Sequence, residues 1–530
     1  VLVDNGFITE DMIVRALQMQ LGLKVVQLTG VTIPKEVRNL VSVDILKKYT
    51  CIPFELDPYN ANILHLAMAD PMDMVAIDDI SIVTNLQIEP YIATTRDILA
   101  AIDRCYGASE TLDAARRFTQ ERAQLRGGAA DDDTDTDVSD APIVQLVRSL
   151  IEQAIRQRAS DIHIEALENK VRIRYRIDGA LYERMVYDNS LLPAISTRIK
   201  ILGGMDISEK RKPQDGRMSI MVDRQDYDIR ISSLPTVHGE KIVMRISSKL
   251  NLTRNKKELG LPPDEMERFN HMLASPFGII LVTGPTGSGK STTLYTALSE
   301  LNKEAVNIVT VEDPVEADIE GINQVQVNNK VDLNFASALR SILRQDPDII
   351  MIGEIRDQET AAIAVKASIT GHLVVSTLHT NSAASTITRL ADMEVENYLI
   401  ADSVVGVIAQ RLVRRVCPNC GVVHEASPAD LKTLGLQNLN RKVMLRYPGH
   451  KECVRCGGTG YFGRIGIYEI MPITNDLRQA INQGKNADEL EAIALRHGMK
   501  TLRMSAIEYA LKGITTVEEV RRVAFEDEDE

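Results

Sequence analysis

Residues 284–291 read Gly-Pro-Thr-Gly-Ser-Gly-Lys-Ser, and this stretch decides the fold class of the chain. The apolar run 278–283 precedes it, and residues 292–298, which carry a helical pattern, follow it. A buried strand, a glycine-rich turn and a helix start are the context of the GxxxxGK[ST] phosphate loop. In such a loop, backbone N–H groups and a helix N-terminus converge on one anion. The sequence therefore predicts a nucleoside-triphosphate site in a parallel α/β domain.

The residues of this loop have separate predicted roles. Lys290 reaches the outer phosphates, and the hydroxyl of Ser291 is a ligand for Mg²⁺. The predicted nucleotide-binding set is Gly284, Pro285, Thr286, Gly287, Ser288, Gly289, Lys290, Ser291 and Thr292. The alternative is a glycine turn with a lysine on a solvated helix start, and the flanking strand and helix make it the weaker interpretation.

The overall composition bounds the class of protein. A chain of 530 residues has room for about three or four domains. The formal charge is −13, but residues 131–140 and 526–530 hold eleven acids and no base. The rest of the chain is close to neutral and aromatic residues make up only 4%, so we expect no nucleic-acid partner.

Targeting signals are not evident in the sequence. No apolar run approaches the length of about eighteen residues that a membrane helix needs, and no signal peptide opens the chain. We therefore expect a cytoplasmic protein. Because the chain starts with Val1, we also expect the natural protein to begin earlier.

Composition and periodicity divide the chain into six segments. The predicted segments are an N-terminal α/β adaptor (1–106), an acidic flexible linker (107–141), an α+β domain (142–250), a parallel α/β core (251–416), a tetracysteine module (417–460) and a C-terminal helical region with an acidic tail (461–530). In the α+β domain, period-two patterns predict a mostly antiparallel sheet from strands at 171–177, 218–222, 227–231 and 241–246. In the core we expect strands at 279–283, 307–311, 349–352 and 373–377, and in the last segment helices at 474–482, 487–497 and 501–512.

Polar residues follow three predicted core strands, at the edge where open α/β sheets bind ligands. Glu312 and Glu354 each stand at a strand end, where an acid downstream of a phosphate loop can hold Mg²⁺ or activate water. His379 follows the next strand and could sense the γ-phosphate. Taken singly, the acids would be solvated strand ends and the histidine a structural residue.

Four cysteines form two CxxC knuckles. They are Cys417, Cys420, Cys453 and Cys456. Four thiolates give a closed, tetrahedral and therefore structural Zn²⁺ site. Disulfides do not suit the cytosol, and a redox pair would need a thioredoxin-like context that is missing, so zinc is favoured.

Arginines gather in two parts of the chain. The set comprises Arg211, Arg217, Arg230, Arg245, Arg340, Arg344 and Arg356. A guanidinium supplied by a second domain or subunit offsets charge on a transferring phosphoryl group, while other arginines in the set would be ordinary ion-pair partners.

With these motifs in order, the chain resembles the bacterial secretion ATPases that power type II secretion and type IV pilus assembly. The resemblance rests on Ser160–Glu165, Pro213–Arg217, the phosphate loop, Glu312–Glu316, Gly353–Asp357, residues 371–381 and the tetracysteine module. It covers nearly the whole chain.

The resemblance implies a homohexameric ring with a RecA-like ATPase domain, a PAS-like domain at about 142–250, and Mg²⁺–ATP in the cleft between them. It implies that Glu312 positions the attacking water, that Ser291 and Glu354 hold Mg²⁺, and that His379 lies near the γ-phosphate. Arg230 and Arg245 would reach the nucleotide of their own or a neighbouring subunit.

The adaptor is similar to the family's N-terminal domain, which docks on the cytoplasmic domain of an inner-membrane platform protein. The resemblance also implies a second partner, a polytopic platform protein of the inner membrane. Residues 2–20 match half of a motif that binds cyclic di-GMP in some relatives, and this binding is ranked as the minority interpretation because only one copy is visible. Between the branches, type II secretion is favoured over pilus assembly. A nucleic-acid translocase or a nucleotide-sensing scaffold on the same core is the remaining alternative.

Overall fold

The computed structural model describes residues 10–28, 31, 33–103, 105–106, 141–248, 256–438, 441–449, 453 and 455–525. They belong to two compact units, residues 1–248 with 450–459, and residues 249–449 with 460–530. The predicted linker up to residue 140, the start of the 2–20 motif and the acidic tail lie outside the described residues. Within the described ranges, no helix combines the length and the apolarity needed to cross a membrane.

The adaptor region is α/β, as predicted. Its elements are α1 (Glu10–Leu21), α2 (Lys35–Arg38), α3 (Val43–Tyr49), β1 (Cys51–Leu56), β2 (Ile63–Met68), α4 (Met74–Thr84) and β3 (Gln87–Ile92). The central strand β2 pairs antiparallel with β1 and parallel with β3. Leu64 and Leu66 of β2 are fully buried with Ile80 of α4, so the helix packs on the sheet.

The second region of the first unit is a six-stranded antiparallel sheet with two helices. Its elements are α6 (Ala141–Arg156), β4 (Ala159–Ala166), β5 (Lys170–Ile177), β6 (Ala180–Asp188), α7 (Leu192–Leu202), β7 (Gln214–Val222), β8 (Gln225–Thr236) and β9 (Gly239–Ser248), with strand order β6-β5-β4-β9-β8-β7. Along β5, buried apolar residues alternate with partly exposed arginines, so one face meets the helices. The predicted antiparallel sheet is confirmed, but sequence analysis missed β4 and β6.

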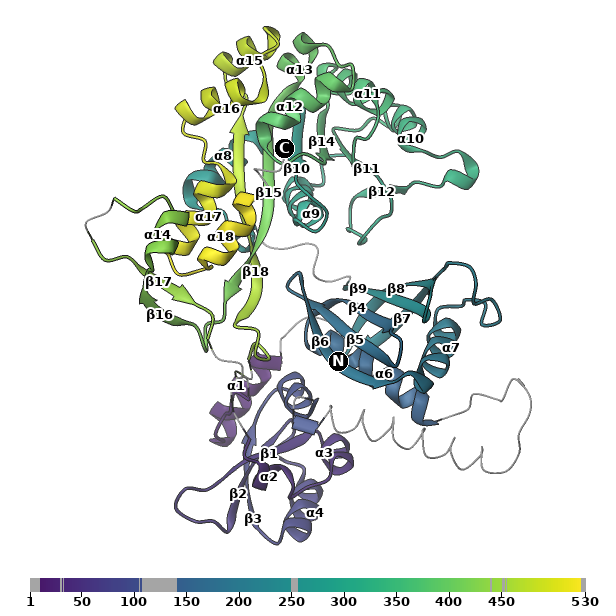
Figure 1. Ribbon diagram of the computed structural model, residues 1–530, viewed down its shortest axis with the longest axis vertical. Coiled ribbons are helices and arrows are strands. Elements are labelled where there is room, and N and C mark those ends of the chain that lie inside the picture. Colours follow the sequence, from purple (N-terminus) through teal and green to yellow (C-terminus); the bar gives the residue numbers. More distant parts are fainter. Residues whose placement is uncertain are drawn as a thin grey trace. The chain divides into compact units, whose positions relative to one another are not determined.

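The second unit is built on a seven-stranded sheet (Figure 1). Its strands are β10 (Gly278–Thr283), β11 (Ile308–Glu312), β12 (Asn323–Gln326), β13 (Ile349–Ile352), β14 (Leu373–Leu378), β15 (Val404–Val416) and β18 (Tyr461–Pro472), in the order β12-β11-β13-β14-β10-β15-β18. All neighbours are parallel except β15 and β18. The four predicted core strands are confirmed.

Helices cover both faces of this sheet. Ile279 and Leu281 of β10 pack in one apolar cluster with helices α10 (Phe335–Ile342), α11 (Gln358–Ile369), α12 (Ala383–Asp392) and α13 (Asn397–Ser403). Ile280 and Val282, which point the other way, pack with α8 (Pro263–Leu273) and α9 (Lys290–Leu301). Burial on both faces explains why β10 reads as a continuous apolar run.

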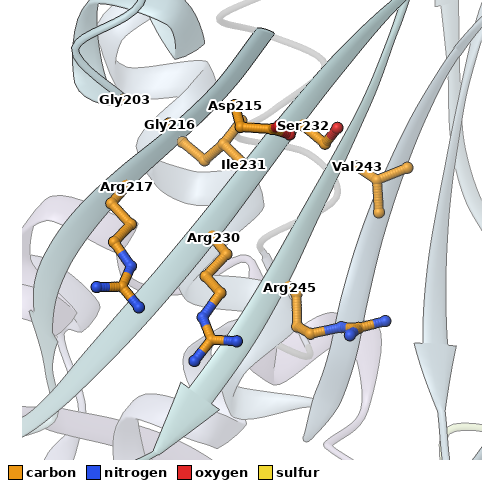
Figure 2. A pocket seen from close by; sticks show the side chains of 9 residues that line it. All are labelled: Gly203, Asp215, Gly216, Arg217, Arg230, Ile231, Ser232, Val243 and Arg245. Carbon is orange, nitrogen blue, oxygen red and sulfur yellow. The ribbon is translucent and has the colours of Figure 1, made fainter. Parts of the chain in front are cut away.

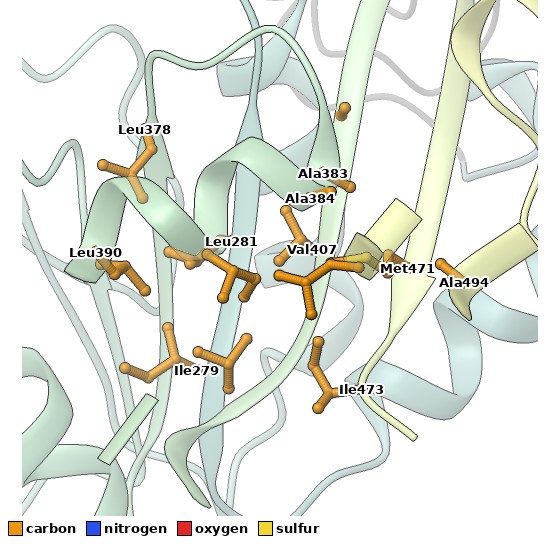
Figure 3. Close-up of a cluster of buried hydrophobic side chains, with 14 of the residues drawn as sticks. Ile279, Leu281, Leu378, Ala383, Ala384, Leu390, Val407, Met471, Ile473 and Ala494 are labelled. Carbon is orange, nitrogen blue, oxygen red and sulfur yellow. The ribbon is translucent and has the colours of Figure 1, made fainter. Parts of the chain in front are cut away.

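The C-terminal residues complete the same core. After β16 (Val422–Glu425), α14 (Pro428–Thr433) and β17 (Met444–Tyr447), strand β18 joins the sheet and leads into α15 (Asn475–Asn482), α16 (Ala487–Arg496), α17 (Leu502–Leu511) and α18 (Val517–Phe525). Figure 3 shows Met471 of β18 and Ala494 of α16 beside Val407 of β15. The sheet therefore extends beyond residue 416, where sequence analysis ended the α/β core, because β18 pairs with β15.

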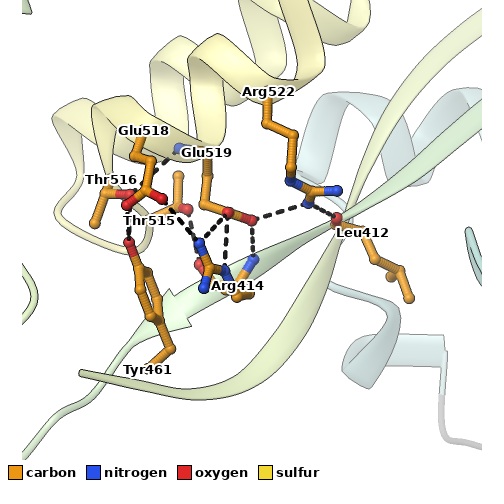
Figure 4. Close-up of polar contacts among 8 residues, drawn as sticks. All are labelled: Leu412, Arg414, Tyr461, Thr515, Thr516, Glu518, Glu519 and Arg522. Atoms are coloured by element: carbon orange, nitrogen blue, oxygen red, sulfur yellow. Dashed lines mark hydrogen bonds and ion pairs between the residues drawn. The ribbon is translucent and has the colours of Figure 1, made fainter. Parts of the chain in front are cut away.

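A buried polar network ties α18 to β15 (Figure 4). Glu519 is fully buried and accepts hydrogen bonds from the backbone N of Arg414 at 2.8 Å and its Nε at 2.9 Å. Arg522 Nη2 donates to Glu519 at 2.9 Å and to the carbonyl of Leu412 at 2.7 Å. Burial alone would raise the pKa of Glu519, but the hydrogen bond from Arg414 and the two guanidinium groups hold it below its usual range.

Candidate functional site

The phosphate loop takes a shape that glycine makes accessible. It links the end of β10 to the start of α9, and φ is 140° at Gly284, 80° at Gly287 and 94° at Gly289. A Cβ at Gly284 would lie 2.3 Å from the carbonyl oxygen of Gln410, and one at Gly289 would lie 2.8 Å from the side chain of the same residue. The first and third glycines therefore serve both conformation and close packing, whereas Gly287 faces open space and serves conformation alone.

Lys290 is folded back over this loop. Its ammonium donates to the carbonyl oxygens of Gly284 at 2.7 Å and Pro285 at 3.1 Å. Burial lowers the pKa of Lys290 to about 8, and the charge of Glu354 acts in the opposite direction. A poorly solvated ammonium group beside the backbone of a glycine-rich loop is suited to binding an anionic ligand.

Gln410 of β15 and Thr380, just after β14, support the loop, and sequence analysis did not single them out. Gln410 of β15 accepts a hydrogen bond from Thr293 of α9 at 2.7 Å, and both are buried. Thr283 accepts from the backbone N of Thr380 at 2.9 Å and so joins β10 to the segment after β14. These contacts depend on strands brought together by long-range pairing, and no local motif announces them.

Glu354 and His379 come together at the ends of β13 and β14. Their side chains are joined by an ion-pair contact of 3.5 Å between His379 Nε2 and Glu354 Oε2, and Arg356 Nη2 lies 2.5 Å from Glu354 Oε1. Burial and the charge of Lys290 lower the pKa of His379, against the effect of Glu354. The fold therefore brings together three charged or titratable side chains that are distant in sequence and that influence one another electrostatically: Lys290, Glu354 and His379.

Glu312 is placed differently from Glu354. It ends β11, is buried, and accepts hydrogen bonds from Tyr295, from Thr310 at 2.6 Å and from Gln324 at 3.0 Å. To orient a water, its carboxylate would have to exchange one of these donors.

The loop fits a Mg²⁺-bound triphosphate by its own geometry. The Ser288 hydroxyl is buried without a hydrogen-bond partner in the structure, and the loop glycines keep the space beside it clear. Ser291 is exposed at the first turn of α9, where a hydroxyl can serve as a magnesium ligand. Glu354 carries a carboxylate, the kind of oxygen donor that Mg²⁺ prefers.

The predicted arginines of the antiparallel sheet form one row (Figure 2). Arg217 on β7 is opposite Arg230 on β8, which in turn is opposite Arg245 on β9. The three line a hollow of about 720 Å³ together with Asp215. Arg245 also contacts Asp161 at 3.2 Å. This row concentrates positive charge on one face of the sheet, in the first unit.

Two other predicted arginines have structural partners. Arg340 of α10 forms an ion pair with Glu359 of α11. Arg344 donates to the carbonyl of Arg340 at 2.7 Å. Both contacts hold α10 in place. These two arginines therefore have structural roles and are not part of the group around Lys290.

The four predicted zinc ligands lie together. All four sulfur atoms of Cys417, Cys420, Cys453 and Cys456 lie within 4.8 Å of one another, and all four residues are buried. A closed set of four thiolates matches the donor set of structural zinc.

Sequence profiles of two families match this chain. The family described as type II/IV secretion system protein matches residues 136–522, and the MshEN domain matches residues 21–112. Among solved structures, the ATPase DotB of Legionella pneumophila is similar with a TM-score of 0.54 at 22% identity, over 75% of this chain and 98% of DotB. At that identity the likeness concerns the fold.

Three relatives show the extent of the sequence similarity. The type IV pilus assembly ATPase PilB of Thermus thermophilus is 43% identical over 524 residues, which cover 98% of this chain and 58% of that protein. The protein of the same name in Myxococcus xanthus is 41% identical over 542 residues, covering 98% and 92%. The type II secretion system ATPase E of Vibrio cholerae is 46% identical over 388 residues, covering 73% and 76%.

Proposed function

Because this chain belongs to the family of type II/IV secretion system proteins, we propose that it is an ATP hydrolase that drives pseudopilus assembly and protein export in type II secretion. The observation that supports hydrolysis best is the grouping of Lys290, Glu354 and His379 beside the phosphate loop. Cations, a carboxylate and a polarised imidazole at one sheet edge are the parts that phosphoryl transfer requires.

Each group has a proposed role in the site. Residues 284–292 hold the phosphates, with Ser291 and Glu354 as ligands for Mg²⁺, which would neutralise charge between the outer phosphates. His379 senses the γ-phosphate, a role supported by its contact with Glu354 and by a pKa that burial and the charge of Lys290 lower. Glu312 orients the attacking water after exchanging one of its hydrogen bonds. Zn²⁺ at the four cysteines stabilises the fold of the module.

The positive row on the antiparallel sheet is proposed to complete the nucleotide site. Arg230 and Arg245 supply guanidinium groups to a triphosphate held by the RecA-like domain of their own or a neighbouring subunit, in a homohexameric ring. The alignment of these arginines on adjacent strands supports this role, because one anion can meet several of them. The sheet with α6 and α7 is proposed to be the PAS-like domain.

The adaptor carries a surface suited to a protein partner. On α4 and just before it, five apolar side chains are more than half exposed: Met72, Met74, Val75, Ile82 and Val83. Such a patch marks an interaction site. We assign it to the cytoplasmic domain of an inner-membrane platform protein, which would hold the ring at the cytoplasmic face of that membrane. Cyclic di-GMP binding by the adaptor stays the minority interpretation.

Type IV pilus assembly is the second candidate function. It is favoured by the two PilB relatives, whose similarity covers 98% of this chain. The higher identity to the type II secretion ATPase over its shorter match favours secretion. Complementation of strains that lack either ATPase would decide between them.

The test of hydrolysis is a Lys290→Ala variant of the full chain. We expect its Mg²⁺-dependent ATP turnover to fall to background, while circular dichroism shows an unchanged fold. Lys303→Ala, in the loop after α9, is the matched control and should keep wild-type turnover. Undiminished hydrolysis by Lys290→Ala would contradict the proposal.

A further inference from the structure

The adaptor contains a second group of metal-ligating side chains, unrelated to the nucleotide site. Asp57, His65 and Glu89 each present one ligand atom, and these atoms lie within 4.8 Å of one another. Strand pairing creates the group, because His65 on the central strand is opposite Glu55 on β1 and Glu89 on β3. Asp57 follows directly after β1. The three residues therefore converge from separate parts of the sheet.

His65 is oriented as metal-bound histidines are. The residue is 4% exposed, and its ring packs near Phe54 and Tyr91. Nδ1 lies 3.1 Å from Glu55 Oε1 in a hydrogen bond, which fixes the ring and directs Nε2 toward the other two carboxylates. A carboxylate that accepts from the far nitrogen is the usual outer partner of a metal-ligating histidine.

The buried Nε2 atom has no hydrogen-bond partner. It lies 3.0 Å from Glu89 Oε2 and 3.4 Å from Asp57 Oδ2, but neither oxygen meets it in hydrogen-bond geometry. A cation between the three atoms satisfies all of them at once.

Each carboxylate is anchored through one oxygen and offers the other. Asp57 Oδ1 accepts from the backbone N of Tyr59 at 2.8 Å and of Asn60 at 2.9 Å, and its Oδ2 faces His65. Glu89 Oε1 is held by Lys24 Nζ at 2.8 Å, and its Oε2 faces His65. These anchors fix both carboxylates so that the second oxygen of each is directed at His65.

The spacing suits a first-row divalent metal. Two ligands that each lie about 2.1 Å from an ion are about 3.0 Å apart at a right angle and about 3.4 Å apart at the tetrahedral angle. We propose that Asp57, His65 and Glu89 bind a divalent transition-metal ion, such as Zn²⁺, which clamps the three strands of the adaptor together. One nitrogen and two carboxylate oxygens leave further positions for water.

The test is the zinc content of the full chain after equilibration with Zn²⁺ and dialysis. We expect two zinc ions per chain in the wild type, one at the four cysteines and one in the adaptor. Asp57→Asn and His65→Gln should each retain one, and Glu55→Gln should weaken the second site about 10–100-fold. Asp70→Asn is the matched control, because Asp70 also accepts a backbone N–H, at 2.9 Å from Met72, but is not in the group.

Asp57→Asn keeps the proposal testable if His65→Gln fails to fold, because an amide oxygen can still accept from Tyr59 and Asn60. Circular dichroism checks that each variant is folded. A single zinc ion per wild-type chain would overturn the proposal. A second ion that persists in folded Asp57→Asn would overturn it as well.

Discussion

Raising the pH from 7 to 9 should weaken nucleotide binding, because free Lys290 loses its proton in this range. Burial lowers the pKa of Lys290 to about 8 in the nucleotide-free protein. A triphosphate over the loop stabilises the ammonium, so the pKa of Lys290 is higher in the complex than in the free protein. Binding therefore takes up a proton, and the affinity falls as the pH rises through the pKa of the free protein.

The size of the effect follows from the fraction of charged lysine. With a pKa of about 8, about 90% of the free protein carries the charged lysine at pH 7 and about 10% at pH 9. If only the charged form binds, the apparent Kd rises about tenfold between these two pH values. Phosphate groups, whose second ionisation lies near pH 6, and His379, whose pKa is lowered, are already deprotonated and add little to this change.

Isothermal titration with a non-hydrolysable ATP analogue and Mg²⁺ measures both quantities. The Kd is followed from pH 7 to 9, and buffers of different ionisation enthalpy give the number of protons taken up. Lys290→Arg is the matched control, because a guanidinium stays charged and its affinity should not vary over this range. A wild-type affinity that is flat from pH 7 to 9, without proton uptake, would refute the reasoning.

Two further predictions concern the carboxylates. Glu354→Gln should reduce ATP turnover by about 10²–10³-fold, because it removes a carboxylate proposed to hold Mg²⁺ at the developing charge, while the Kd for the analogue changes only a few-fold. Steady-state kinetics with titration would check this, and unchanged turnover would exclude Glu354 from the chemistry. Glu519→Ala should cost about 1–3 kcal/mol because it leaves the partly buried guanidinium and the backbone N–H of Arg414 without their acceptor, and hydrogen exchange of residues 517–525 at pH 7 should accelerate. Because the pKa of Glu519 is lowered in the fold, its contribution is present above about pH 4.3 and is lost as the pH falls through the folded value.

The parts of the fold that could be predicted from sequence are those with a local pattern. The phosphate loop was predicted from its glycines and its lysine, and the core strands from apolar runs that are buried on both faces. Strands β4 and β6 were missed. Much of β6 is only partly buried, so its alternation is weak, and β4 is buried at most of its positions and does not alternate.

The contacts that could not be predicted depend on pairing between distant strands. The support of the loop by Gln410 requires that β15 lie beside β10, and the antiparallel partner β18 comes about fifty residues later. The adaptor metal group has the same origin, since no motif relates Asp57, His65 and Glu89 and only the register of three strands unites them.

The different surroundings of Glu312 and Glu354 suggest how the site is coupled to the rest of the unit. Glu354 lies with Lys290 and His379 and is suited to the chemistry. Glu312 instead joins three elements, since Tyr295 belongs to α9, which begins at the loop, and Gln324 belongs to the edge strand β12. Any shift of α9 that accompanies a change at the phosphates must move or break the Tyr295 hydrogen bond. Breaking it would free Glu312 Oε2 for water while Oε1 keeps its hydrogen bond from Gln324 of β12, so that the proposed water activation would depend on the position of α9.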